Sequence, residues 1–317
     1  MNDDRKTHLD PRAVLLLLGC CAAWGLSQVA AKVSLAEMPP LYLAALRSLG
    51  AALLLAVWAR SRGLPLWQRD GSGRAGLLLG VLFAAEFACV FIGLQFTSAS
   101  RMVVFLYSAP FVVALGMPLL MRSERLDRVQ ILGLLAAFAG VAWAYGESFG
   151  AATAGPRQWL GDALGLAAAL LWGLTTLALR GSVLAHALPE KTLMYQLLVS
   201  AVLLGLAAPL AGEAWPAQLS SATWWTLGFQ TVVVTFASYL VWFWLVRHYP
   251  ATRLSAFTLL TPVFGLLAGV VMLGEPATAR LLVALVAVCA GIALVNRAPR
   301  GALPPATPTG PERPAKR

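Results

Sequence analysis

Ten apolar stretches occupy most of this 317-residue sequence. Each is close to the roughly 17–25 residues that a helix needs to cross a bilayer. Only 12% of the residues are charged and the mean hydropathy is +0.74, whereas about a quarter of a soluble domain is charged. These features predict an all-α membrane protein with ten transmembrane helices and no separate soluble domain. The predicted spans are 14–31, 41–59, 75–96, 103–121, 129–145, 163–179, 192–212, 224–246, 254–273 and 279–295.

The positive charges are distributed unevenly between the two sides of the predicted bundle. An even number of spans places both termini on one side, and the segments on that side hold 19 of the 24 Lys and Arg residues. Because cytoplasmic loops collect Lys and Arg, we expect both termini in the cytoplasm. Topology thereby explains the net charge of +10, and nucleic acid is not an expected partner. The tail at 298–317 is rich in Pro, Gly and Ala, which predicts a disordered cytoplasmic segment.

The two halves of the chain share a pattern of marker residues. A Trp-Gly-Leu motif at 24–26 recurs 148 residues later, and a cation follows each Trp by eight residues. Each half holds five spans, an odd number, so the second half should enter the membrane from the opposite side. The sequence therefore predicts two inverted five-helix repeats. Further matching pairs, 151 or 152 residues apart, are Ala99 with Ala251, Pro110 with Pro262, and Glu124 with Glu275.

Two ionisable side chains lie deep inside predicted spans. Arg47 is the seventh residue of the second span, and Glu86 is the twelfth residue of the third. Such a charge costs about 2.5–3.5 kcal/mol or more at the bilayer centre, so it usually faces the bundle interior and pairs. At about 1.5 Å per residue, Arg47 lies roughly 9 Å and Glu86 roughly 15 Å below the outer ends of their spans. We expect the two side chains to be near one another, as a structural ion pair or as part of a substrate site.

Aromatic and neutral polar side chains are further candidates for a substrate path. Trp24 and Trp172 either form a wall of that path or pack within the bundle, where Gly25 and Gly173 let neighbouring helices approach. The candidate substrate contacts are Trp24, Gln28, Arg47, Glu86, Tyr107, Trp172, Tyr239 and Thr258.

Prolines at matching positions should break two spans. Pro110 and Pro262 each remove a backbone donor and free a carbonyl one turn earlier, and Thr258 lies close enough to offer a hydroxyl group. Each break is either a packing kink or part of the substrate site. Lys32 and Arg180 either favour the dipole at a helix C-terminus or act in gating.

No motif for catalysis, metal binding or cofactor binding is present. The four cysteines fall within apolar spans, the three histidines are peripheral, and no H-E-x-x-H, G-x-S-x-G or P-loop pattern occurs. We therefore expect no catalytic residues, no metal and no cofactor. Transport by such a chain would draw its energy from a gradient or from the solute itself.

The order of the motifs resembles that of a known family. The motifs are Trp24-Gly25 with Lys32, Thr97-Ser98-Ala99 leading to Ser108-Ala109-Pro110, and Gly274-Glu275-Pro276 before the last span. Together with the duplication, this order resembles the EamA-type members of the drug/metabolite transporter superfamily. The resemblance implies ten helices and a central cavity between two EamA-like repeats, at 13–146 and 160–296. Two departures are Ser123-Glu124-Arg125, where a Gly-Glu-Pro-like turn is expected, and Tyr249-Pro250, at the counterpart of Thr97-Ser98.

The resemblance further implies the export of a small organic solute, such as an amino acid, a metabolite or a drug-like compound, across a bacterial inner membrane. The expected partners are that solute, the lipid bilayer and, as an open possibility, a second copy of the chain. An intramembrane enzyme and a membrane scaffold or sensor are the alternatives. The enzyme lacks a reactive constellation in the sequence, and the scaffold or sensor lacks a soluble output domain.

Overall fold

The computed structural model describes Lys6, residues 8–68, 70–144, Gly146, residues 156–273 and 279–297. Within these residues the chain is helical and contains no strand. The α-helices are α1 (Pro11–Leu35), α2 (Pro40–Ser61), α3 (Gly73–Gly93), α4 (Ala99–Leu106), α5 (Ala109–Leu120), α6 (Arg128–Ala144), α8 (Gln158–Arg180), α9 (Pro189–Leu210), α10 (Ser221–Phe229), α11 (Tyr239–His248), α12 (Ala251–Phe257), α13 (Thr261–Leu273) and α14 (Ala279–Asn296). Short 3-10 turns form η1 (Arg122–Glu124), η2 (Val183–His186) and η4 (Thr258–Leu260), and a π-helix forms η3 (Gln230–Ser238).

Seven helical segments of the described chain are long and apolar enough to cross a membrane. One of them, Ser221–His248, joins α10, η3 and α11 into a single segment of 28 residues. Apolar helices also occupy the other predicted spans, but α6 and α14 are shorter, and α12, η4 and α13 form a broken segment. The predicted tail at 298–317 and the Gly274-Glu275-Pro276 turn lie outside the described residues.

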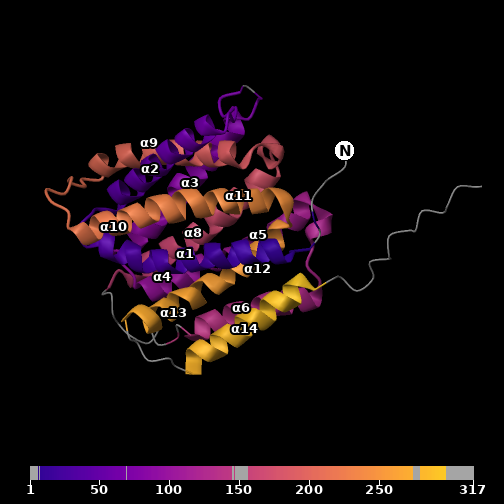
Figure 1. Ribbon diagram of the computed structural model, residues 1–317. Helices are drawn as coiled ribbons and strands as arrows, with labels where there is room; N and C mark the ends of the chain where they lie inside the picture. Colours follow the sequence, from indigo (N-terminus) through magenta and orange to yellow (C-terminus); the bar gives the residue numbers. More distant parts are fainter. Residues whose placement is uncertain are drawn as a thin grey trace, which may run out of the picture.

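Both ends of the described chain lie at the same end of the helix bundle. The backbone N–H of Lys6 donates to the carbonyl of His248 (3.0 Å), and Arg253 contacts both His8 and the carbonyl of Asn296. Figure 1 shows the helices side by side, with the start of α1 and the finish of α14 at one end. We call this end the termini end and the other the far end.

The first helices of the two halves run in opposite directions. α1 begins at the termini end, where its N-cap residue Asp10 accepts hydrogen bonds from the Tyr249 hydroxyl (3.0 Å). α8 finishes there, because its last residue, Arg180, donates to the Tyr249 carbonyl (3.2 Å). The direction of the chain is thus reversed between the halves, as the odd number of predicted spans per half requires.

The contacts between helices are related by exchanging the halves. α1 packs against α13 and α10, just as α8 packs against α5 and α3; α2 pairs with α9, and α6 pairs with α14. Gly25 and Gly173 permit two of these contacts. A Cβ atom at Gly25 would lie 2.8 Å from the Gly265 nitrogen, and one at Gly173 would lie 2.5 Å from Val112 Cβ. These distances are too short for any side chain, so both glycines allow the helix approach expected of them.

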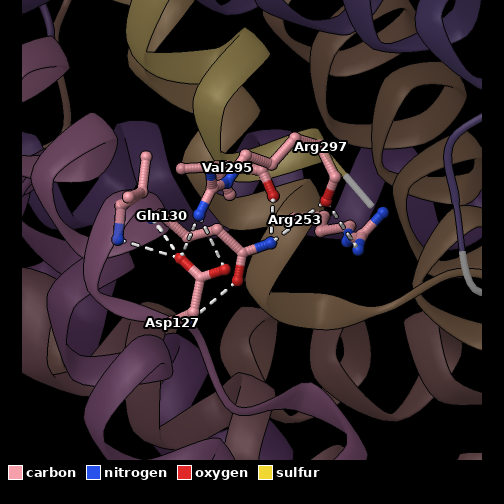
Figure 2. A network of polar contacts seen from close by, with 6 residues as sticks. Asp127, Gln130, Arg253, Val295 and Arg297 are labelled. Atoms are coloured by element: carbon pink, nitrogen blue, oxygen red, sulfur yellow. Dashed lines mark hydrogen bonds and ion pairs between the residues drawn. The ribbon is translucent and has the colours of Figure 1, made fainter. Parts of the chain in front are cut away.

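A polar network at the termini end joins the start of α6 to the finish of α14 (Figure 2). Arg297 donates to both carboxylate oxygens of Asp127 at 2.9 Å, and the Gln130 amide donates to the Val295 carbonyl at 2.9 Å. Arg253 donates to the Arg297 carbonyl (3.5 Å). The last carbonyls of a helix lack partners within the helix, and these side chains supply them.

Candidate functional site

Aromatic side chains from several helices meet in the middle of the bundle. The ring centroid of Trp24 on α1 lies 6.5 Å from that of Trp172 on α8 and 5.5 Å from that of Trp242 on α11, each edge to face. The Trp24 indole N–H donates to the Ser238 hydroxyl at 2.7 Å. Tyr107, at the finish of α4, lies 5.6 Å from Trp172 between centroids. The two tryptophans of the repeated motif therefore meet across the boundary between the halves.

These rings line a central cavity of about 100 Å³. Residues of both halves contribute to it, and most of its wall is apolar or aromatic. A single water molecule needs roughly 10–15 Å³ of such a cavity. The cavity therefore has room for several waters or for a small organic molecule. Its polar groups on different helices include Arg47 from α2, Glu86 from α3, Gln196 from α9 and Gln230 from η3.

Arg47 and Glu86 face this cavity without forming a direct ion pair. They are 3% and 8% exposed. The ion pairs found among the described residues do not include one between them. The Arg47 guanidinium instead lies over the Phe87 ring, with Cζ 3.9 Å from the centroid. Cation–π contact of this kind stabilises a desolvated cation.

Two amide side chains at the cavity have unmet hydrogen-bonding capacity. Neither Gln196 Nε2 nor Gln196 Oε1 has a partner, although the residue is fully buried. Gln230 Nε2 donates to the Ser34 hydroxyl at 3.2 Å, but Gln230 Oε1 has no partner. Leaving such a group unpaired costs about 1–3 kcal/mol, so these atoms are suited to a polar ligand or to water.

The π-helix η3 positions part of this wall. In its wider turns the chain makes i→i+5 hydrogen bonds, and π-helical turns within α-helices often occur at functional sites. Ser238, the last residue of η3, donates to the Val234 carbonyl at 2.5 Å while accepting from Trp24. η3 therefore connects Gln230, at one of its ends, to the tryptophan cluster at the other.

The structure brings most of the predicted substrate contacts together and separates one of them. Thr258 lies in η4, away from the cavity lining, and its hydroxyl donates to the Ser255 carbonyl at 2.6 Å. The backbone N–H of Thr258 donates to the same carbonyl, so the hydroxyl takes part in a local turn and not in the cavity wall. Gln28 lies on α1, but its side chain is outside the described part of the structure. The predicted contacts that line the cavity are Trp24, Arg47, Glu86, Tyr107, Trp172 and Tyr239.

Both prolines at matching positions lie next to interrupted helices. α4 finishes at Leu106, and Pro110 is the second residue of α5. Pro262 is the second residue of α13, directly after the 3-10 turn η4. Tyr107 lies in the first of these interruptions, so the break brings its ring to the cavity.

A buried ion pair lies at the termini end of the cavity. Leu179 and Val246 line the cavity, and Arg180, the next residue of α8, pairs with Glu124 and donates to the Val246 carbonyl (3.1 Å). Glu124 also accepts from the backbone N–H of Thr252 at 3.0 Å. The pair therefore joins η1, α8, α11 and α12. By contrast Lys32, the matching cation near the far end, is exposed.

The described residues include no group of three or more His, Cys, Asp and Glu side chains able to hold a metal ion. Cys20 and Cys21 are buried and free, and their thiols lie near the carbonyls of Ser238 (3.6 Å) and Phe257 (3.8 Å). They act as small core residues in this arrangement.

An apolar helical bundle built from two matching halves, around a cavity that holds a few buried polar groups, is the architecture of a multi-pass membrane transporter. The sequence pattern of the EamA-like transporter family matches residues 11–146 and 159–297. The chain belongs to this family.

Known proteins agree with this classification. The chain is 28% identical over 299 residues to an uncharacterized transporter of Bacillus subtilis, covering 90% of this chain and 92% of that one. It is 28% identical over 286 residues to a probable amino-acid metabolite efflux pump of Salmonella typhimurium, covering 87% and 92%. A crystal structure of a protein 19% identical in sequence shares the fold, with a TM-score of 0.77 over 90% of this chain and 96% of that one.

Proposed function

We propose that the protein is a secondary transporter that exports a small organic solute through the central cavity by alternating access. The observation that carries this proposal is the cavity itself, which lies between two halves of opposite direction and holds buried polar atoms without partners. Inverted repeats build transporters because the two halves can close the path alternately on either side of the membrane. The name of the Salmonella relative supports efflux of a small metabolite.

In the proposed topology the chain crosses the membrane ten times, in one repeat at 13–146 and a second at 160–296. The termini end faces the cytoplasm of a bacterium, because the segments there hold most of the Lys and Arg residues. The shorter helices α6 and α14 cross as a packed pair.

The buried Arg180–Glu124 pair supports a closed termini end in this conformation. Both side chains are almost fully buried, at 2% and 4% exposed. For solute to enter from the cytoplasm, α8 and η1 would have to separate, and the pair would break. The present conformation then corresponds to the state with its cytoplasmic end closed.

Solute flux in sealed vesicles tests the proposal. Purified protein is reconstituted into liposomes loaded with a panel of small acids, amines and amino acids, and efflux is compared with that from protein-free liposomes. We expect saturable efflux of at least one class of solute. Efflux that rises linearly with concentration, or none above the protein-free level, would reject a carrier.

Alternating access is tested with a single cysteine in the cavity. Ser27 lines the cavity, and Ser27→Cys is made in a chain whose exposed Cys289 is replaced by alanine. An impermeant thiol reagent should reach Cys at 27 from either side in separate experiments, and transported solute should change both labelling rates in opposite directions. Labelling from one side only, unaffected by solute, would contradict alternation.

A further inference from the structure

Arg47 differs from the other deeply buried cations of the described chain in lacking an anionic or carbonyl acceptor among the contacts found. Arg180 has Glu124 and two backbone carbonyls, and Lys191 has Asp70 at 2.7 Å and the carbonyl of Gln68 at 2.6 Å. Arg253 donates to the carbonyl of Asn296. The Nε and Nη2 atoms of Arg47 are buried and have no hydrogen-bond partner at all. The guanidinium instead interacts with the Tyr239 hydroxyl and with the rings of Phe87 and Phe91. A buried charge without an anionic or carbonyl acceptor is costly, so Arg47 has unused capacity for an anion.

The two partnerless atoms form a single recognition surface. Nε–H and Nη2–H point from the same edge of the planar guanidinium group, and two parallel N–H bonds from that edge match the two oxygens of a carboxylate. The Phe87 ring covers a face of the guanidinium. Because guanidinium hydrogen bonds form in the plane of the group, stacking on that face leaves this edge available.

The protein does not use its own carboxylate for this edge. Glu86 lines the same cavity and is mostly buried, yet it makes no direct ion pair with Arg47. The other partnerless polar atoms of the cavity belong to neutral amides, Gln196 and Gln230. A planar anion from outside the chain is therefore the chemistry that fits Arg47, while the tryptophan and tyrosine rings offer an apolar surface for the body of the same molecule.

We propose that the transported solute carries a carboxylate group, which binds bidentately to the Nε/Nη2 edge of Arg47, and an apolar body that packs against Trp24, Trp172 and Tyr239. This assignment rests on the proposed transport function. Both simple organic acids and zwitterions carry this group. Glu86 discriminates between them, because a zwitterion brings an ammonium group to offset its charge and a simple acid does not.

Four compounds with the same phenyl body separate the head groups. Phenylacetate and 2-phenylglycine carry the carboxylate, benzylamine lacks it, and phenylacetamide replaces it with a neutral group of similar shape. Binding to the full-length protein in detergent is measured by thermal stabilisation and by tryptophan fluorescence. We expect at least one of the two acids to bind and both carboxylate-free compounds to bind about tenfold more weakly or not at all.

Two substitutions at Arg47 test the geometry. Arg47→Gln removes the charge, and Arg47→Lys keeps it but lacks the paired N–H edge. Each should weaken binding of the acids by about tenfold or more. The melting temperature without ligand should stay at or above that of the wild type, because each substitution removes a buried cation that lacks part of its hydrogen bonds or replaces it with a smaller one. Ser48→Ala is the matched control, since Ser48 adjoins Arg47 but contacts Ser200 and does not line the cavity.

Glu86→Gln separates the two sources of the carboxylate. If the transported solute is a zwitterion, this substitution should weaken the binding of 2-phenylglycine and leave the binding of phenylacetate unchanged. If the solute is a simple acid, phenylacetate should bind the variant more tightly than the wild type. Either result supports the carboxylate assignment.

Three outcomes would overturn it: failure of both acids to bind, equal binding of phenylacetamide and phenylacetate, or unchanged acid affinity in both Arg47 variants. Flux in vesicles is scored separately. Arg47-dependent acid binding without flux would retain the carboxylate site and reject transport. Flux of a carboxylate-free solute that persists in Arg47→Gln would retain transport and reject the carboxylate site.

Discussion

At the scale of single residues, several buried polar atoms without partners lie beside the aromatic rings of the cavity. Most buried polar groups in folded proteins are hydrogen-bonded, and a membrane strengthens that requirement because no bulk water is present. The partnerless atoms of Arg47, Gln196 and Gln230 all belong to the cavity. A membrane protein tolerates such groups where a ligand or water regularly meets them.

Substitution of the central tryptophans should affect transport and stability differently. Trp172→Phe shortens an aromatic wall and should change the KM for solute more than the folded yield. Trp24→Phe also removes the hydrogen bond to Ser238, so its unfolding free energy should fall by about 1 kcal/mol. Transport kinetics and detergent melting curves measure the two effects. Trp225→Phe, at a site 81% exposed, is the control and should change neither; unaltered kinetics in both cavity variants would place the substrate path elsewhere.

Glu86→Gln should leave the protein folded, because the carboxylate forms no direct ion pair with Arg47 in the structure. The cavity-lining residues include Glu86 as their acidic side chain, so the variant should lose any stimulation of transport by an imposed proton gradient. Flux with and without the gradient measures this, and Glu190→Gln, outside the cavity, is the control. A large loss of stability that Arg47→Gln partly restores would show instead that the two side chains are functionally paired.

Residue types and positions in the sequence point to several of the side chains that line the cavity. Charged and aromatic residues at membrane depth stand out in an apolar sequence, and Arg47, Glu86 and Trp24 were predicted on that basis. Gln196 and Gln230 are not among the predicted contacts, because only three-dimensional packing shows that amide atoms of both residues lack partners. Thr258 was selected for its closeness to Pro262, and sequence proximity could not show that its hydroxyl satisfies a local carbonyl.

At the scale of helices, the backbone departs from regular α-helix between α4 and α5, through η3 and in η4. The prolines indicated the breaks beside α5 and α13, since a proline cannot donate a backbone hydrogen bond. The π-helix η3 was not predicted, because the residues 230–238 have no composition that distinguishes them from an ordinary apolar helix. In the structure η3 packs against α1 and α2.

The Arg180–Glu124 pair gives a prediction about the stability of the contact between η1, α8, α11 and α12. Glu124→Gln leaves Arg180 buried without its counter-charge, and removal of one partner from a buried pair costs about 3–5 kcal/mol. Glu124→Gln combined with Arg180→Gln should be more stable than the single variant. Denaturation in detergent measures both. As a control, Asp127→Asn, at the half-exposed pair with Arg297, should lower the free energy of unfolding by less. If the losses of stability in the two single variants at Glu124 and Arg180 simply add in the double variant, the two side chains are not coupled.

The N-cap of α1 gives a prediction about acid stability. The hydrogen bond from Lys6 is the largest cause that lowers the pKa of Asp10 to about 2, and the backbone N–H of Ala13 and the Tyr249 hydroxyl act in the same direction. A lowered pKa in the folded state means that the stabilisation is fully present above the ordinary value of 3.8 and is lost as the pH falls toward 2. Asp10→Asn should therefore reduce the stability difference between neutral and strongly acidic pH. An unchanged pH profile of the melting temperature would contradict this role.

At the scale of the whole molecule, exchange of the two halves relates most of the helix contacts. Motif spacing predicts the repeat. At one position where the second half departs from the motif, the hydrogen bond to the matching aspartate is still formed. Tyr249 replaces the counterpart of Thr97, yet the Tyr249 hydroxyl donates to Asp10 as the Thr97 hydroxyl donates to Asp162 (2.7 Å). Which helices pair across the halves could not be predicted, because nearly every span is apolar and its partner depends on the fit of small residues such as Gly133 and Gly291.

The proposed orientation predicts which loops are accessible from outside the cell. In a chain with Cys289 replaced by alanine, Ser61→Cys at the termini end should be protected from an impermeant thiol reagent in whole cells. Gln218→Cys, between α9 and α10 at the far end, should be labelled. Both positions are exposed in the structure, so protection would reflect the membrane and not burial. The reverse labelling pattern would overturn the orientation and the charge argument together.

The buried pair between Arg180 and Glu124 has a kinetic consequence. If each transport cycle opens the termini end, the pair must separate once per turnover, and the free energy of separation enters the activation barrier. Each 1.4 kcal/mol in a barrier changes a rate by about tenfold. An ion pair that must break in every cycle limits the turnover rate. A variant with a moderately weaker pair should therefore have a higher turnover rate than the wild type and a lower melting temperature.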